Sequence, residues 1–181
     1  PKYNFDLIRL GRDYDGGYIV CKSILNSKEL ISLGINNDWS FEKDYFKKIN
    51  SKILTFDPTT NISLLLDFFF NSILRFYKPK DILKSLYDII DYYSFFKKNI
   101  KHHELLVWYD SNKMISLNKI LEEFHSEIFL KIDIEGFEYR VLDDILKNQN
   151  KLNGLVIEFH DFDLHRIKIK NFIDKLSLEL V

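Results

Sequence analysis

The sequence predicts a doubly wound α/β domain, in which a mostly parallel central sheet carries helices on both faces. Four short runs are rich in Ile, Leu, Val and Phe, which is typical of strands buried on both faces. Polar turns and residues at helical spacing follow these runs, so strands and helices alternate along the chain. We expect a single domain over residues 1–181, truncated at both ends, because the chain starts without Met and stops inside an apolar run.

The composition excludes several classes of protein. Hydrophobic residues make up 46% and charged residues 29%, which excludes a disordered chain. The 26 basic and 27 acidic side chains give a net charge of −1, so neither nucleic acid nor an anionic membrane surface is expected as a partner. The single cysteine, Cys21, excludes an internal disulfide and favours a cytoplasmic location. Polar residues interrupt the most apolar stretch, 64–77, so no membrane span is expected.

The first elements are a hairpin and a strand–helix unit. Residues 15–17, Asp-Gly-Gly, lie between two apolar segments and are a hairpin turn signal. The run 29–35 predicts a buried strand, and Asp38 or Ser40 then caps a helix. Further strands are expected at 52–56, 128–134 and 155–160, with a weaker candidate at 105–109. Further helices are expected to start near Ser116 and to cover 139–146.

The middle of the chain, residues 61–101, departs from this alternation and is expected to form a helical lid or insertion. Over 62–77 a polar residue recurs at every fourth position, which leaves one narrow polar stripe on an otherwise apolar helix. A second helix is expected over 81–98, with Asp81 as its N-cap. The domain core, a closed lid or another subunit must cover the first helix, so a homo-oligomer through these aromatic helices is one expectation.

In a doubly wound sheet, ligands bind outside the carboxyl ends of the strands. Gly34 follows the first strand and Asp57 follows the second. A glycine lets a ligand approach the backbone, and a carboxylate accepts hydrogen bonds from both ribose hydroxyls. Asn36, Asn37 and Trp39 stand where a dinucleotide fingerprint has further glycines, so a nucleoside without phosphates, such as S-adenosylmethionine, fits better. A tight turn with a turn-forming Asp57 explains the same pattern.

Charged side chains also gather at the end of the third strand. Lys131, Asp133 and Glu135 alternate, so all three point to one face of the strand. Three charges on one face are costly unless they are paired or reach a cleft. The two explanations are a cleft at this strand end and a salt bridge between Lys131 and a neighbouring carboxylate.

The last strand places Glu158 and His160 on one face. A histidine at the carboxyl end of a strand is well placed as a general base, although a capping role explains it too. Together with Asp133, these residues have the ligand types of a metal site, but we favour the reading without a metal. His102 and His103 are read as surface residues.

Several motifs occur in a fixed order along residues 7–160. They are Arg9-Leu10-Gly11, Asp15-Gly16-Gly17-Tyr18, Ser32 to Glu42, Phe56-Asp57-Pro58, Leu130 to Glu138 and Ile157-Glu158-Phe159-His160. Together they resemble the FkbM-like class I methyltransferases, which use S-adenosylmethionine. The resemblance implies a Rossmann-like class I methyltransferase fold and, in many members, O-methylation of a sugar or polyketide hydroxyl.

The resemblance also implies roles for particular residues. The first turn would bind the methionine and ribose parts of S-adenosylmethionine through Gly34, Ile35, Asn36, Asn37, Trp39, Ser40 and Phe41. Asp57 would hold the ribose, and Asp133 with Glu135 would line the floor of the cofactor and substrate site. The helical segment 61–101 carries no matching motif.

The expected function is therefore an S-adenosylmethionine-dependent O-methyltransferase acting on a small acceptor, such as a sugar of a surface glycan. Asp133 and His160 are the expected catalytic residues, because a sugar hydroxyl is a poor nucleophile and needs a base nearby. We expect the acceptor to bind at the hairpin tip and at Glu158. The tip residues are Asp15, Gly16, Gly17 and Tyr18. A non-catalytic binding module on this fold and a nicotinamide oxidoreductase are the alternatives.

Overall fold

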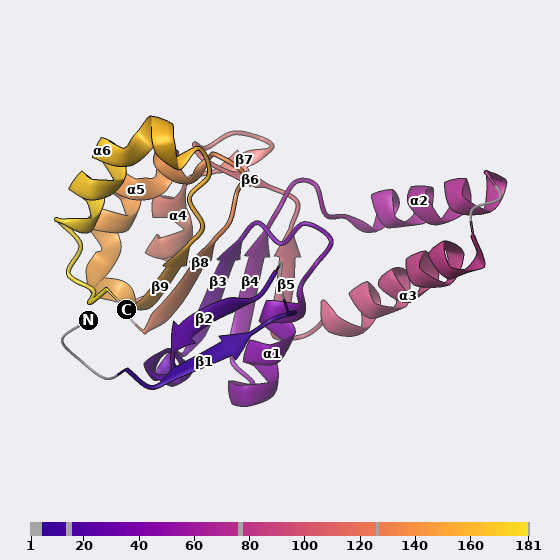
Figure 1. The fold of residues 1–181 in the computed structure, drawn as a ribbon, viewed down its shortest axis with the longest axis horizontal. Coiled ribbons are helices and arrows are strands. Elements are labelled where there is room, and N and C mark those ends of the chain that lie inside the picture. Colours follow the sequence, from indigo (N-terminus) through magenta and orange to yellow (C-terminus); the bar gives the residue numbers. More distant parts are fainter. Residues whose placement is uncertain (1–4, 14–15, 76–77, 126, 181) are drawn as a thin grey trace.

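A computed structural model describes residues 5–13, 16–75, 78–125 and 127–180 (Figure 1). Its centre is a sheet of five parallel strands in the order β5-β4-β3-β8-β9. The strands are β3 (Glu29–Leu33), β4 (Lys52–Phe56), β5 (Ile100–His103), β8 (Ile128–Ile132) and β9 (Leu152–Ile157). Leu33 pairs with both Phe56 and Ile132, so the carboxyl ends of the three central strands lie level. The order reverses between β3 and β8, which is the switch point of a Rossmann-like fold.

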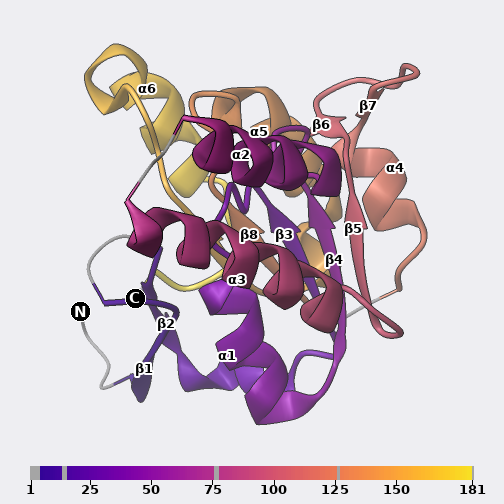
Figure 2. The same cartoon turned by 90° about the vertical axis from the view of Figure 1, so that its right-hand side faces the viewer.

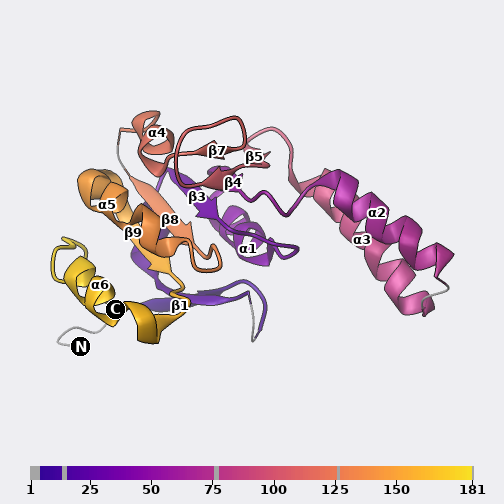
Figure 3. The same cartoon turned by 90° about the horizontal axis from the view of Figure 1, so that it is seen from above.

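Helices cover both faces of this sheet, as the sequence predicts (Figure 3). One face carries α4 (Leu117–Glu122), α5 (Glu138–Asn148) and α6 (Phe162–Ile173), and the short η2 (Gln149–Lys151) follows α5. The other face carries α1 (Ser40–Ile49), η1 (Lys22–Asn26) and the antiparallel hairpin of β1 (Leu7–Leu10) and β2 (Tyr18–Cys21). Each face has its own apolar core, because strands buried on both sides must be covered twice.

The four predicted strands are present, but the edge strand β5 was missed. Its sequence, Ile-Lys-His-His, has a single apolar residue and therefore no apolar run. The candidate at 105–109 is not part of the main sheet: only β6 (Leu106–Val107) forms there, and it pairs with β7 (Met114–Ile115). The last strand runs over Leu152–Ile157 and not over 155–160, so Glu158 and His160 follow it. In the same way β8 ends at Ile132, so Asp133 and Glu135 lie in the turn after the strand.

The two mid-chain helices exist as α2 (Ile62–Leu74) and α3 (Pro79–Phe95). Asp81 is not the N-cap of α3, because the helix begins at Pro79, whose fixed backbone angle suits a first helical position. The two helices contact each other and project from the body as a helical hairpin (Figures 1 and 2). One side of α2 joins the apolar core through Leu65, with Ile62, Leu66 and Phe69 partly buried against it, while the other side of the helix is exposed. None of the described helices is long and apolar enough to span a membrane.

Candidate functional site

A cavity of about 500 Å³ opens at the carboxyl ends of β3, β4 and β8. This volume lies within the range of small-ligand sites. Segments distant in the sequence meet there: the tip of the β1–β2 hairpin, the turns after β3, β4 and β8, and the start of β6. The predicted site residues that line it are Gly16, Tyr18, Gly34, Ile35, Asn36, Asp57, Asp133 and Glu135. The sequence did not predict Leu105, Leu106 and Val107, which form an apolar part of the lining.

Gly34 lines the cavity and also makes room for the neighbouring backbone. It adopts φ +77°, and an added Cβ would lie 1.6 Å from the backbone oxygen of Asp133. The absent side chain thus makes room for the neighbouring protein backbone, in addition to any ligand. The turns after β3 and β8 cross at this point. Two hydrogen bonds hold the strand ends beside the crossing: Gly34 N donates to Phe56 O at 2.9 Å, and Asp133 N donates to Leu33 O at 2.9 Å.

A buried ion pair also stabilises the turn after β3. Lys131 donates to the backbone oxygen of Gly34 at 2.9 Å, and its Nζ lies 3.7 Å from Glu42 Oε1. Ser32 Oγ also donates to this carboxylate, at 2.6 Å. The salt-bridge explanation for Lys131 is therefore correct, while Asp133 and Glu135 reach the cavity. Glu42 was not singled out from the sequence, since an acidic residue in the first turn of a helix is ordinary.

Asp57 joins the turns after β3 and β4. One carboxylate oxygen accepts from the backbone amides of Ile35 and Asn36 at 2.9 and 2.7 Å. The other oxygen accepts from the Thr59 amide at 2.7 Å and from its hydroxyl at 2.6 Å. Burial alone would raise the pKa of Asp57, but these hydrogen bonds outweigh it and hold the pKa below its ordinary value. The carboxylate is thus ionised and organises the turn, as the alternative explanation held.

Several residues of the predicted cofactor turn do not line the cavity. Trp39 is 4% exposed, packs edge-on against Tyr92 and Phe96, and donates from Nε1 to Asp91 at 2.9 Å. Phe41 is buried in the same core. Ser40, whose hydroxyl accepts from the Arg12 amide at 3.0 Å, and the exposed Asn37 also lie outside the lining. A turn exposes some side chains and buries others, and their order in the sequence does not say which.

The hairpin tip reaches the edge of the cavity. Gly16 lines it, and an added Cβ there would lie 2.5 Å from the Asp38 carboxylate. Gly17 is packed against the hairpin itself, where an added Cβ would lie 2.0 Å from the backbone oxygen of Arg12. Asp15 lies outside the described residues.

Tyr18 connects the ends of β8 and β9. Its hydroxyl lies 2.7 Å from Asp133 Oδ2 and 2.8 Å from Glu158 Oε2, so one proton is shared between two carboxylates. Burial, followed by the hydrogen bonds and charges of these two carboxylates, raises the pKa of Tyr18 far above its ordinary value. The phenol therefore stays protonated and holds Asp133 and Glu158 together.

His160 lies beside this pair and is surrounded by carboxylates. Its Nδ1 lies 3.0 Å from Oε1 of Glu138, and its Nε2 lies 3.3 Å from Glu135 and 3.9 Å from Asp133. Burial alone would lower the pKa of His160, but the hydrogen bond to Glu138 and the surrounding negative charge raise it. At pH values above this raised pKa, Nε2 is a free acceptor facing Asp133 and Glu135.

Glu138 is another residue of this site that was not predicted from the sequence. It is fully buried and accepts hydrogen bonds from the backbone amides of Ile134 and Gly136 as well as facing His160. It therefore both fixes the turn after β8 and orients the imidazole of His160. Its position after Gly136 is a typical helix N-terminus, so the sequence offers no signal beyond capping.

Asp133, Glu158 and His160 each offer one ligand atom, and these atoms lie within 4.8 Å of one another. The donor set suits a divalent cation. The Tyr18 hydroxyl already bonds both Asp133 and Glu158, so the arrangement does not require a metal.

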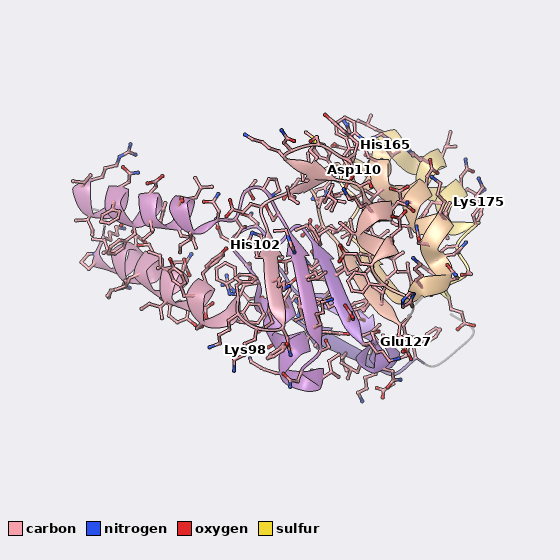
Figure 4. All side chains as sticks on the ribbon, turned by 180° about the vertical axis from the view of Figure 1, so that it is seen from behind. Lys98, His102, Asp110, Glu127, His165 and Lys175 are labelled. Atoms are coloured by element: carbon pink, nitrogen blue, oxygen red, sulfur yellow. The ribbon has the colours of Figure 1, made fainter. Side chains whose placement is uncertain are left out.

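His102 lies on β5 (Figure 4), and it is half-buried, whereas a surface residue was expected. Its Nδ1 lies 2.8 Å from the Thr55 hydroxyl, and its Nε2 lies 2.6 Å from the backbone oxygen of Thr60. Burial lowers its pKa. His103 is also partly buried and stacks on Phe56 with ring centroids 4.8 Å apart. Both histidines support the strand edge behind the cavity, outside its lining.

The parallel sheet, its switch point and the cavity at its carboxyl ends define a Rossmann-like α/β domain. Residues 90–177 match the family model described as the methyltransferase FkbM domain. The fold and this match, which covers 88 of the 181 residues, are consistent with an FkbM-like methyltransferase, the family that the motifs resemble. The match includes Asp133, Glu138 and His160, whereas Gly34 and Asp57 lie before it. No curated protein and no solved structure shows a significant match.

Proposed function

We propose that this chain is an S-adenosylmethionine-dependent O-methyltransferase whose acceptor is a hydroxyl of a small molecule or of a glycan sugar. The charge of the cavity lining carries this proposal. Four carboxylates line it, those of Asp38, Asp57, Asp133 and Glu135. Lys131 is the one lysine among the described lining residues, and its positive charge is already paired with Glu42. Such a lining favours a ligand with positive charge and hydroxyls over one with a pyrophosphate.

The lining fits S-adenosylmethionine in its chemistry. Its apolar part, around Leu105, Leu106 and Val107, suits the adenine ring. Asp57 is the candidate ribose ligand, through the oxygen that the Thr59 hydroxyl would release, and Asp133 with Glu135 suits the cationic end of the cofactor. When bound, S-adenosylmethionine supplies an electrophilic methyl group on a sulfonium.

The protein's own part is placement and proton transfer. Alignment of an acceptor oxygen with the methyl group can supply roughly 7–11 kcal/mol of the barrier. The acceptor oxygen would form the new O–C bond as the methyl–sulfur bond of the sulfonium breaks, which leaves a neutral thioether. The proton of the hydroxyl goes to Nε2 of neutral His160, and Asp133 orients the hydroxyl. Glu138 keeps Nδ1–H hydrogen-bonded, so Nε2 is the nitrogen left to accept.

The acceptor is placed beside this pair, between Glu158 and the hairpin tip. Glu158 is exposed and has further acceptor sites besides its bond from Tyr18. Carboxylates that accept hydrogen bonds suit a polyhydroxylated ligand, which supports a sugar. A cytoplasmic location agrees with the single cysteine of the sequence.

The alternative is a non-catalytic assembly module on the same fold, which the exposed helical hairpin favours. A methyl-transfer assay separates the two. The full-length protein is incubated with S-adenosylmethionine labelled in its methyl group and an extract of the source cell's surface glycans. We expect label in the glycan fraction and about 10²-fold less with Asp133→Asn. Cofactor binding without labelling of any glycan or small-molecule fraction would favour the assembly module.

A further inference from the structure

The helical hairpin exposes a large amount of apolar surface. Ten large apolar side chains on α2 and α3 are between 40% and 73% exposed. Figure 4 draws the side chains of both helices standing clear of the body. At about 200 Å² for each large side chain, this amounts to roughly 1,000 Å² of exposed apolar surface. A surface of this size on a protein marks an interaction site.

Helix α3 carries two apolar stripes, and only one of them is covered. Ile82, Ser85 and Ile89 are half-buried or buried at spacings of three and four, in the hairpin that α3 forms with α2. One residue further on, a second stripe repeats the spacing three, four and three with every member exposed. We call it the outer stripe; its members are Leu83, Leu86, Ile90 and Tyr93. This spacing is that of the a and d positions through which helices pair.

The charges of α3 lie away from the outer stripe. Lys84, Asp88 and Asp91 recur at spacings of four and three, on the opposite side of the helix at 100° per residue. Asp91 accepts hydrogen bonds from Trp39 and Lys43, so this side is turned towards the body. A partner helix can therefore cover the outer stripe without burying an unpaired charge.

We propose that the outer stripe is the interface with a second copy of this chain. The two α3 helices would pair antiparallel about a two-fold axis, and the two α2 helices would flank them in a four-helix assembly. Two observations favour a second copy. The exposed apolar area of both helices together, of which the outer stripe is less than half, exceeds the roughly 800 Å² per partner of a standard interface. Residues 62–95 also carry four basic and four acidic side chains, a balance that does not favour an anionic lipid surface.

The proposed interface leaves the cavity free. None of the described residues of α2 or α3 lines the cavity, and the hairpin joins the body through the turn after β4, where Thr59 does line it. The hairpin therefore holds two copies together at a distance from their sites. The predicted lid over the cavity is not the arrangement in this structure.

The test is the molar mass of the full chain by sedimentation velocity and light scattering, from about 1 to 100 µM. We expect a mass of about twice 21.7 kDa. The double substitution Leu86→Glu and Ile90→Glu should raise the dimer dissociation constant about 100-fold or more. The matched control is Leu164→Glu with Ile167→Glu on α6, where the side chains are 80% and 79% exposed. The control should stay dimeric.

A monomeric wild-type chain over the whole range would overturn the proposal. A dimeric outer-stripe variant, or a control that dissociates equally, would also overturn it, because the interface would then lie elsewhere. Binding of the monomer to phosphatidylcholine–phosphatidylserine vesicles through these residues would replace it with a lipid surface. Circular dichroism checks the fold of each variant, and the single change Tyr93→Lys provides a second outer-stripe variant if the double one does not fold.

Discussion

At the scale of single residues, the site depends on carboxylates that each serve two neighbours. Asp133 faces both Tyr18 and His160, and Glu138 holds both the turn after β8 and the imidazole. Asp57 binds the backbone of two turns. Substitutions at these positions therefore change binding or catalysis together with local order, and the tests must separate the two effects.

Asp57→Ala is expected to affect both stability and cofactor affinity. The change leaves the amides of Ile35 and Asn36 without their acceptor, at a cost of about 2–4 kcal/mol in the free energy of unfolding. S-adenosylmethionine should bind about 10- to 100-fold more weakly. Thermal melting measures the first effect, and calorimetric titration well below the melting temperature measures the second. Unchanged affinity in a destabilised variant would make Asp57 a turn-forming residue alone.

Asp133→Asn and His160→Gln should each lower turnover by about 10²-fold or more. The double variant should be little worse than either single one, because residues that act as one unit are non-additive. His165→Gln on α6 is the control, since this imidazole stacks on Tyr139. Near-full turnover of both single variants would move the base elsewhere, and a harmless His160→Gln alone would leave Asp133 as the acting group.

The pH dependence of kcat/KM should report His160. The neutral imidazole is the base, and its carboxylate neighbours raise its pKa above 6.5, so the rate should rise with pH through that raised pKa. Glu138→Gln keeps an acceptor for the amides of Ile134 and Gly136 but removes a negative charge, which should move the midpoint to lower pH. A midpoint that stays in place in both Glu138→Gln and His160→Gln contradicts this assignment.

At the scale of elements, the crossing of the turns after β3 and β8 makes the site. Gly34 sits at this crossing, and Gly136 lies at the start of the turn into α5; both have positive φ. An added Cβ at Gly34 would strike the backbone of Asp133 at 1.6 Å, whereas at Gly136 the nearest atom lies at 3.9 Å. The two glycines thus differ in available space while sharing the backbone conformation.

This difference predicts unequal effects of the same substitution. Gly34→Ala should lower the free energy of unfolding by more than about 3 kcal/mol, because backbone must move. Gly136→Ala should cost about 1–2 kcal/mol, from the left-handed conformation alone. Denaturant unfolding of both variants measures the difference. Equal losses would mean that the crossing relaxes easily and does not shape the cavity.

The sequence predicts most of the strands and helices. The prediction fails where neighbouring elements decide which residues are buried. Apolar runs identify the four buried strands, whereas β5 carries Lys101, His102 and His103 and has no such signature. Periodicity predicts α2 and α3 but not that they leave the body. In the site, the alternation of charged and apolar residues predicts the carboxylates that follow the strands. The burial of Trp39 and Glu138 is visible only in the packed structure, since a turn or a helix start can expose or bury any residue type.

At the scale of the whole molecule, the cavity and the hairpin lie in separate parts of the structure. The cavity gathers residues from the first hairpin to the turn after β8, so the family match over 90–177 includes the polar cluster but not the turns of Gly34 and Asp57. The helical hairpin contributes apolar surface outside this cavity. Cofactor binding and self-association should therefore respond to different substitutions.

The central claim is that the cavity accepts a cationic nucleoside cofactor, and calorimetric titration of the full chain with S-adenosylmethionine and with NADH tests it most directly. The carboxylate-rich lining predicts saturable binding of one S-adenosylmethionine per chain and no binding of NADH. Binding of NADH without binding of S-adenosylmethionine would contradict the account.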